Sequence, residues 1–151
     1  MRTFSTLDEV AAAAGEELGT GDWLEVTQDR VDTFADATDD HQWIHVDVER
    51  ANDGPFGGPI AHGYLTLSLI PFLGAQVFAF AGDMARVNYG LNKVRFVSPV
   101  RVGSKIRSRV DLLSVEAIDK GQRATLQHTV EIKGSDKPAC VAETVTLLMA
   151  P

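Results

Sequence analysis

The sequence has little of what disulfide-linked, zinc-binding or secreted proteins carry. Cys140 is the one cysteine among 151 residues, so no intramolecular disulfide can form, and no Cys/His cluster has zinc-site spacing. The first residues lead into Asp8 and Glu9 instead of an apolar segment, so no signal peptide is expected and the expected location is cytoplasmic. This length predicts a single domain over residues 1–151.

Basic residues are also scarce. Fourteen Lys and Arg against 21 Asp and Glu give a net charge of −7, which argues against a nucleic-acid partner. Positions 93–109 are the exception, since they hold basic residues and no acidic one. Such a stretch could bind a small polyanion, for instance a nucleotide-bearing thioester. The alternative is an ordinary solvated strand face, which the alternation near its end favours. The basic residues are Lys93, Arg95, Arg101, Lys105, Arg107 and Arg109.

Charged residues are absent from Gly54 to Gly82, which raises the question of a membrane span. Three prolines and a histidine interrupt this run, and no basic cluster flanks it. A helix that is apolar on all sides can equally be buried inside a domain. We therefore expect no membrane span but a long buried helix over about residues 61–81, kinked at Pro71.

The remaining pattern predicts an α+β fold. Thr6, Thr27 and Asp47 are predicted N-caps of three helices, the second ending near Thr38. A short strand is expected at 23–26, and a four-stranded antiparallel meander at 84–97, 104–118, 122–133 and 138–148. Only a sheet that wraps the apolar helix can bury it. A small sheet leaves part of the helix uncovered, which predicts pairing with a second copy of the chain.

The segment from Phe34 to His45 carries the most chemical information. It places the Asp40 carboxylate and the His45 imidazole five residues apart where a helix ends, and such a pair can hold and activate one water. Asp40 could instead cap local backbone amides. His41 and His45 would be metal ligands only on a continuous helix with further ligands, which the sequence does not offer, so no metal is expected.

This segment resembles the signature of the MaoC-like dehydratases, the (R)-specific enoyl-CoA hydratases of the hot-dog fold. That signature is an aromatic residue, then Gly-Asp, one residue, Asn-Pro, an aliphatic, His, and later a small residue. Asp39, Gln42 and Trp43 depart from its Gly, Asn and Pro. The matching positions are Phe34, Asp40, Ile44, His45 and Ala51.

Two further stretches resemble the same family. The Ala61-His62-Gly63 sequence is similar to the start of the hot-dog helix, and residues 95–103 are similar to a strand and turn of hot-dog proteins. Gly63 lets a carbonyl approach backbone amides that could stabilise an enolate oxygen, or it only permits close packing. His62 is interpreted mainly as a hydrogen-bonding residue at the helix start.

The resemblance implies a hot-dog fold, a homodimer, and reversible hydration of a trans-2-enoyl-CoA to the (R)-3-hydroxyacyl-CoA without any cofactor. The carrier could also be an acyl carrier protein. Asp40, His45 and Gly63 would be catalytic, and Gln42, His62, Lys93 and Arg95 would contact substrate. An acyl-CoA thioesterase and a non-catalytic acyl-binding partner subunit are the alternatives.

Overall fold

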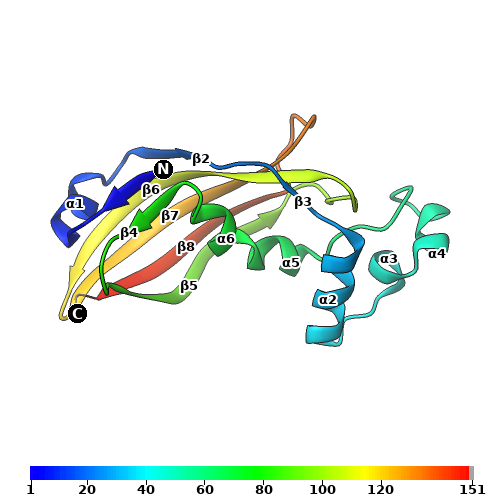
Figure 1. Cartoon of the computed structure of the whole chain (residues 1–151), viewed down its shortest axis with the longest axis horizontal. Helices are drawn as coiled ribbons and strands as arrows, with labels where there is room; N and C mark the ends of the chain where they lie inside the picture. Colours follow the sequence, from blue (N-terminus) through cyan, green and yellow to red (C-terminus); the bar gives the residue numbers. More distant parts are fainter. Residues whose placement is uncertain (150–151) are drawn as a thin grey trace.

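The computed structural model describes residues 1–149, which form an antiparallel sheet with helices against one face and beyond one end (Figure 1). The main sheet has the strand order β2-β6-β7-β8-β5, with β3 also paired to β6, and a small second sheet pairs β1 with β4 in parallel. The strands are β1 (Arg2–Phe4), β2 (Glu17–Thr20), β3 (Leu24–Glu25), β4 (Phe78–Phe80), β5 (Ala85–Phe96), β6 (Lys105–Ile118), β7 (Gly121–Ile132) and β8 (Cys140–Met149). The helices are α1 (Leu7–Ala12), α2 (Gln28–Thr38), α3 (Trp43–Val46), α4 (Val48–Asn52), α5 (Gly63–Ser68) and α6 (Ile70–Gly74). The α+β, hot-dog-like plan predicted from the sequence is confirmed.

All three predicted N-caps are confirmed. The side chains of Thr6, Thr27 and Asp47 accept hydrogen bonds from the backbone N–H three residues later, at the starts of α1, α2 and α4. Each bond satisfies an N–H that the helix itself cannot pair. Helix α2 ends at Thr38, as expected.

The central helix is shorter than the predicted 61–81. It consists of α5 and α6, interrupted at Leu69, and ends at Gly74. Pro71 lacks the N–H that would bond the carbonyl of Leu67, which accounts for the interruption. The last part of the predicted helix is instead strand β4, because Phe78–Phe80 pair with β1. Among the described residues no helix is long and apolar enough to cross a membrane.

The predicted four-stranded meander is correct only for β6, β7 and β8. Strand β5 pairs with β8, from Ala85–Met149 to Phe96–Cys140, and so lies at the sheet edge. The connection after β5 does not form a hairpin, because it pairs with another loop: Ala61 N–H donates to the Val100 carbonyl and Val102 N–H to the Pro59 carbonyl. These bonds also fix the backbone just before α5.

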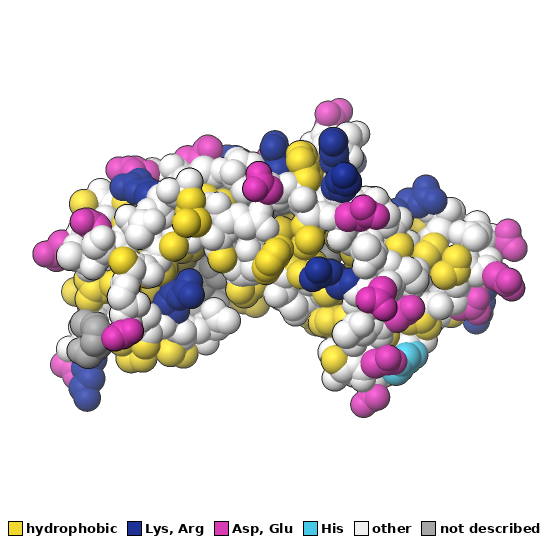
Figure 2. Space-filling view, in the orientation of Figure 1, with side chains coloured by type: hydrophobic (Ala, Val, Ile, Leu, Met, Phe, Trp, Pro, Cys, Tyr) yellow, Lys and Arg dark blue, Asp and Glu magenta, His cyan; other side chains and the backbone are white. Residues whose placement is uncertain are grey.

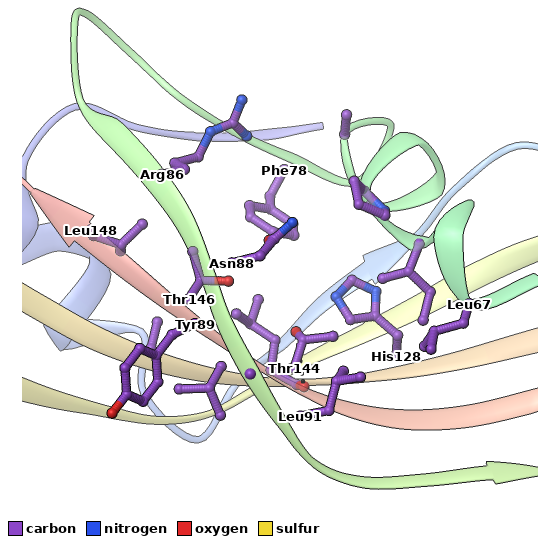
Figure 3. Close-up of a pocket in the computed structure, with 18 of the residues that line it drawn as sticks. Leu67, Phe78, Arg86, Asn88, Tyr89, Leu91, His128, Thr144, Thr146 and Leu148 are labelled. Carbon is purple, nitrogen blue, oxygen red and sulfur yellow. Dashed lines mark hydrogen bonds between the residues drawn. The ribbon is translucent and has the colours of Figure 1, made fainter. Parts of the chain in front are cut away.

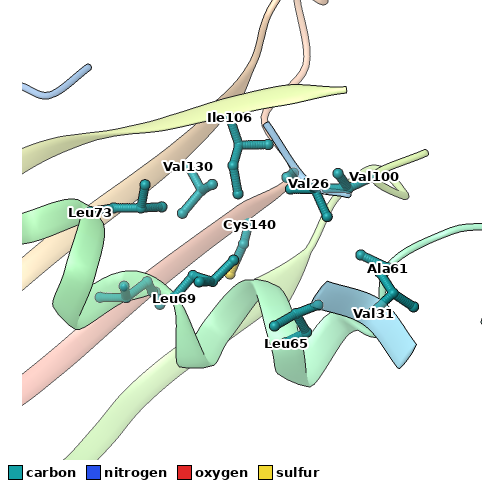
Figure 4. Close-up of a cluster of buried hydrophobic side chains, with 13 residues drawn as sticks. Val26, Val31, Ala61, Leu65, Leu69, Leu73, Val100, Ile106, Val130 and Cys140 are labelled. Carbon is teal, nitrogen blue, oxygen red and sulfur yellow. The ribbon is translucent and has the colours of Figure 1, made fainter. Parts of the chain in front are cut away.

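Helix α5–α6 buries one stripe of side chains against the sheet (Figure 4). Leu65, Leu69 and Leu73 are buried there against Ile106 and Val130. Cys140 is fully buried in the same cluster, and burial raises the pKa of its thiol to about 11. This packing places α5 against the sheet.

The opposite side of this helix and strand β5 leave large apolar side chains exposed. Tyr64 is 69% exposed, Phe72 51% and Tyr89 64%. Figure 2 shows hydrophobic side chains at the surface on this face, which is hollowed between the sheet and the group of helices α2–α4. The sheet therefore covers the helix only in part, as the sequence predicted.

Candidate active site

Asp40 is positioned by an abrupt end of α2. The C-cap residue Asp39 has φ 57°, the left-handed conformation, which turns the chain out of the helix. Glycine adopts this conformation most easily, and Asp and Asn are among the few other residues that tolerate it. The structure thus explains why the resembled signature has Gly at this position and why Asp can replace it.

Helix α3 presents His45 directly after this turn. Gln42 before it has φ −57° and ψ 135°, an extended conformation that a following proline would impose. Trp43, which replaces that proline, is held by packing: its ring lies against Gly54 and under the Arg50 guanidinium, 4.2 Å from the ring centroid. The backbone before His45 is therefore maintained by side-chain contacts in place of a proline.

The His45 ring is buried and its orientation is fixed. Its Nδ1 lies 2.6 Å from the carbonyl oxygen of Ile60, which can only accept, so Nδ1 carries the proton. In the neutral ring Nε2 is then an acceptor. Burial lowers the pKa of His45, although the bond to Ile60 opposes this effect. The ring is accordingly neutral near pH 7 and can accept a hydrogen bond from water.

His62 joins the same group from the start of α5. Its Nε2 donates to the backbone carbonyl of Asp40 at 2.9 Å, and its ring stacks on His45 with centroids 3.8 Å apart. Phe34 also contacts this ring, in a tilted arrangement with centroids 5.0 Å apart. The remaining nitrogen, His62 Nδ1, is buried and has no hydrogen-bond partner among the described residues. A buried polar atom of this kind needs a water or a ligand.

Three side chains therefore converge. One ligand atom each from Asp40, His45 and His62 lies within 4.8 Å of the others. A water between them could donate to two of them, and an oxygen with two nitrogens is also a donor set that a metal ion could accept. His41, paired with His45 in the sequence-based metal hypothesis, is outside this group: it bonds the Asp36 carboxylate at 2.8 Å, which raises its pKa.

Gly63 is the first residue of α5, so its N–H has no acceptor within the helix. A Cβ on Gly63 would lie 3.2 Å from the ring of Phe96 on β5. Close packing is thus one reason for glycine here. The same contact places the end of β5 beside the start of α5, next to the three converging groups.

The other predicted substrate-binding residues lie outside this cluster. Gln42 is exposed, and its backbone N–H points to Asp40 Oδ1 at 3.4 Å. Lys93 and Arg95 are exposed on β5, where they alternate with Val94, which packs against the core. They therefore lie on the strand's outer side.

Much of the remaining basic stretch is engaged in structure. Arg107 pairs with Glu131 at 2.8 Å, and Arg109 lies near Glu17 and Asp111. Arg101 donates to the Gly57 carbonyl at 2.6 Å. Buried and partly exposed side chains alternate along this part of β6, which agrees with the solvated-face interpretation.

Sequence reasoning missed how the site is supported. The Ile60 carbonyl that fixes His45 and the Phe96 ring over Gly63 have no local sequence signal, because both contacts join distant segments. Phe34 had a signal, as the aromatic residue of the signature, and its position against His62 gives that residue a physical role.

Comparisons with known proteins agree on one family. The family model described as MaoC like domain matches residues 9–133. The chain is 54% identical over 151 residues to 3-hydroxyacyl-thioester dehydratase Z of Mycobacterium tuberculosis strain H37Rv, covering 99% of this chain and 100% of that protein. It is 42% identical to nodulation protein N of Rhizobium leguminosarum bv. viciae, covering 95% of this chain and 91% of the relative.

A solved structure shares the fold and part of the sequence. The (R)-hydratase from A. caviae involved in PHA biosynthesis superposes with a TM-score of 0.73 at 27% identity. The match covers 89% of this chain and 95% of that one.

Proposed function

The chain belongs to the MaoC-like dehydratase family, and we propose that it catalyses the reversible hydration of trans-2-enoyl thioesters to (R)-3-hydroxyacyl thioesters. The observation that carries this proposal is the convergence of Asp40, His45 and His62 on one space at the start of α5. Relatives named as a 3-hydroxyacyl-thioester dehydratase and an (R)-hydratase support the reaction class. The thioester is carried by coenzyme A or by an acyl carrier protein.

Asp40 and His45 hold the reacting water. Asp40, as the anionic member, takes one proton from it while His45 Nε2 accepts the other hydrogen as a hydrogen bond. The water oxygen bonds to C3, and the electrons of the C2–C3 double bond move toward the thioester carbonyl. Asp40 then returns the proton to C2 on the same face. Dehydration is the reverse of this sequence.

His62 positions the pair. Its Nε2–H holds the Asp40 backbone carbonyl, and its ring stacks on His45, so both reacting side chains are located by one residue. Enzymes gain rate when such groups are fixed before substrate binds.

Gly63 supplies the electrostatic part of the reaction. Its N–H at the start of α5, which has no acceptor within the helix, donates to the thioester oxygen, where negative charge develops in the enolate. One such donor contributes about 2.7–4 kcal/mol in well-studied enzymes. The absence of a Cβ keeps the approach to this N–H open.

We further propose that the working form is a homodimer built on β5. This edge strand is twelve residues long, its outer edge has no partner among the described residues, and Val87, Tyr89, Leu91 and Phe96 are 45–64% exposed. A long exposed apolar edge favours pairing with another strand. Two copies paired at β5 would also place each start of α5 near the interface.

A direct assay tests the proposed reaction. Purified protein is mixed with trans-2-butenoyl-CoA and longer enoyl-CoAs, and loss of the enoyl-thioester absorbance, release of free thiol and product stereochemistry are followed. We expect absorbance loss without thiol release and an (R) product. Activity that survives a metal chelator supports a held water. Thiol release would instead indicate a thioesterase, and chelator-sensitive activity would assign the converging groups to a metal.

A further inference from the structure

A cavity of about 680 Å³ lies between α6 and strands β5, β7 and β8 (Figure 3). This is within the range of small-molecule binding sites. Much of its wall is apolar, and the apolar lining includes Leu67, Ile70, Phe78, Leu126 and Leu148. No role in the reaction described above uses this cavity.

The cavity begins where α5 ends. Leu67 and Ser68 line it, whereas Gly63 at the other end of α5 lies at the candidate active site. At a rise of ~1.5 Å per residue, Ser68 is roughly 7–8 Å along the helix from Gly63. If the proposed function is correct, an acyl chain whose carbonyl lies at Gly63 can run along α5 and enter the cavity once it is of medium length.

His128 gives this cavity a polar group at a defined place. It is 4% exposed, projects from β7, and lies among Leu67, Leu91 and Thr144 in Figure 3. Its Nδ1 lies 3.1 Å from the hydroxyl oxygen of the buried Ser108. Nε2 has no hydrogen-bond partner among the described residues. It is also not one of their fully buried unpaired atoms, so part of its surface is accessible. Because His128 lines the cavity, we take this accessible part to face the cavity.

The residues around His128 leave space for its ring. A Cβ on Gly74 would lie 3.0 Å from His128 Cε1, so glycine at this point of α6 makes room for the ring. Burial lowers the pKa of His128 to about 4, so the ring is neutral near pH 7. Packing alone would be satisfied by leucine, which fills a similar space without a hydrogen-bonding group.

We propose that the cavity binds an acyl chain that carries a hydroxyl group, which hydrogen-bonds to His128 Nε2, and that His128 thereby determines substrate choice. A hydroxyl suits either tautomer of the ring. If Ser108 donates to Nδ1, Nε2–H donates to the hydroxyl oxygen. If Ser108 donates to the Arg109 carbonyl, 3.4 Å away, Nε2 accepts from the hydroxyl.

Matched acyl chains test the proposal by binding. Dissociation constants are measured by calorimetry for saturated, unreactive acyl-CoAs of one length, with and without a hydroxyl along C6 to C10. We expect one hydroxyl position to bind about tenfold more tightly than the plain chain, the effect of one hydrogen bond. The His128→Leu variant should abolish this preference, and His128→Gln, which keeps a hydrogen-bonding group, should retain part of it.

Thr144→Val is the matched control, because Thr144 also lines the cavity but its hydroxyl already donates to the Leu126 carbonyl at 3.5 Å. Its preference should stay that of the wild type. Equal binding of plain and hydroxylated chains to the wild type, or a preference that survives His128→Leu, would overturn the proposal. Since this measurement needs no turnover, failure of the protein to hydrate trans-2-butenoyl-CoA would count against the proposed reaction alone.

Discussion

At the scale of single residues, the site depends on two side chains that act on one water. Asp40→Asn removes the proton acceptor and keeps the shape, and His45→Gln keeps a polar group but loses the imidazole. Each should lower kcat by roughly 10²–10⁴. The double variant should lose little more than the worse single one, because members of one unit are not additive.

Steady-state kinetics of the three variants, with circular dichroism as the folding control, decide the point. His41→Gln is the matched control, since this exposed histidine lies outside the converging groups and should keep near-wild-type activity. Multiplicative losses in the double variant would mean that Asp40 and His45 act on separate steps.

Asp39 allows a second test at this scale. Its side chain is exposed and its φ is 57°, so the backbone conformation governs the effect of substitution. Asp39→Gly should change the free energy of unfolding by no more than about 0.5 kcal/mol, because the left-handed conformation costs glycine little. Asp39→Val should lose about 1–2 kcal/mol, because a branched side chain is strained there.

Urea unfolding measures these differences. Ala37→Val, at an exposed position inside α2, reports the smaller cost of a branched residue in a helix. If Asp39→Val were no worse than Ala37→Val, backbone strain would not be what restricts this position.

At the scale of elements, the exposed edge of β5 should control assembly. Val87→Lys combined with Tyr89→Lys places two charges on the proposed interface and should convert a dimer to a monomer. Leu113→Lys is the control, because Leu113 is similarly exposed, at 41%, but lies on β6, away from this edge. Light scattering at micromolar concentrations measures the mass, and a monomeric wild type would contradict the proposed dimer.

The outer side of β5 provides a prediction about the carrier. Lys93 and Arg95 are exposed there and have no ion pair among the described residues. If they attract carrier phosphates, Lys93→Glu with Arg95→Glu should raise KM several-fold, leave kcat unchanged, and weaken the salt dependence of KM. The exposed Lys105 on β6, changed to Glu, should have little effect. If the KM of the double variant were unchanged, Lys93 and Arg95 would be ordinary solvated residues that do not bind the carrier.

At this scale, the sequence could predict the features that depend only on residues close together in the chain. The caps at Thr6, Thr27 and Asp47 need only a few neighbouring residues, and all were predicted correctly. The apolar run Phe78–Phe80 suits a helix or a strand equally, and its pairing with β1 decides between them. The strand order was missed for the same reason. Strand β5 pairs with β8 and not with β6, because the loop after β5 forms its hydrogen bonds with the loop before α5.

The candidate site shows the same division. Asp40 and His45 could be predicted because they lie within one continuous signature. The contact of His62 with the Asp40 carbonyl crosses 22 positions of sequence and depends on the loop before α5. That His62 Nδ1 is buried without a partner among the described residues could be recognised only from the structure.

At the scale of the whole molecule, stability should fall in mild acid. The pKa of His128 is about 4 in the folded chain against 6.5 for an ordinary histidine, so between these values the unfolded chain binds a proton that the folded one does not. The contribution of His128 to stability is constant well above pH 6.5 and decreases as pH falls, by roughly 3 kcal/mol at pH 4. Burial of His45 acts in the same direction.

Urea midpoints from pH 7.5 to pH 4.5 test this dependence. His128→Leu should flatten the decrease, whereas the cavity-wall control Thr144→Val should show the wild-type slope. A wild-type curve that stayed level to pH 4.5 would mean that His128 is protonated readily in the folded state.

The position of β5 beside β8 also has a consequence for how the chain folds. Strand β5 spans residues 85–96, but its partner is the last strand, residues 140–149. During synthesis β5 emerges early and finds no neighbour until β8 has followed, while β6 and β7 can already pair as a hairpin. Folding is slow when a long loop must lose conformational entropy before the contacts that offset this loss can form. The strand that we propose joins two copies therefore has no partner within its own chain until the last strand of the sheet has been made.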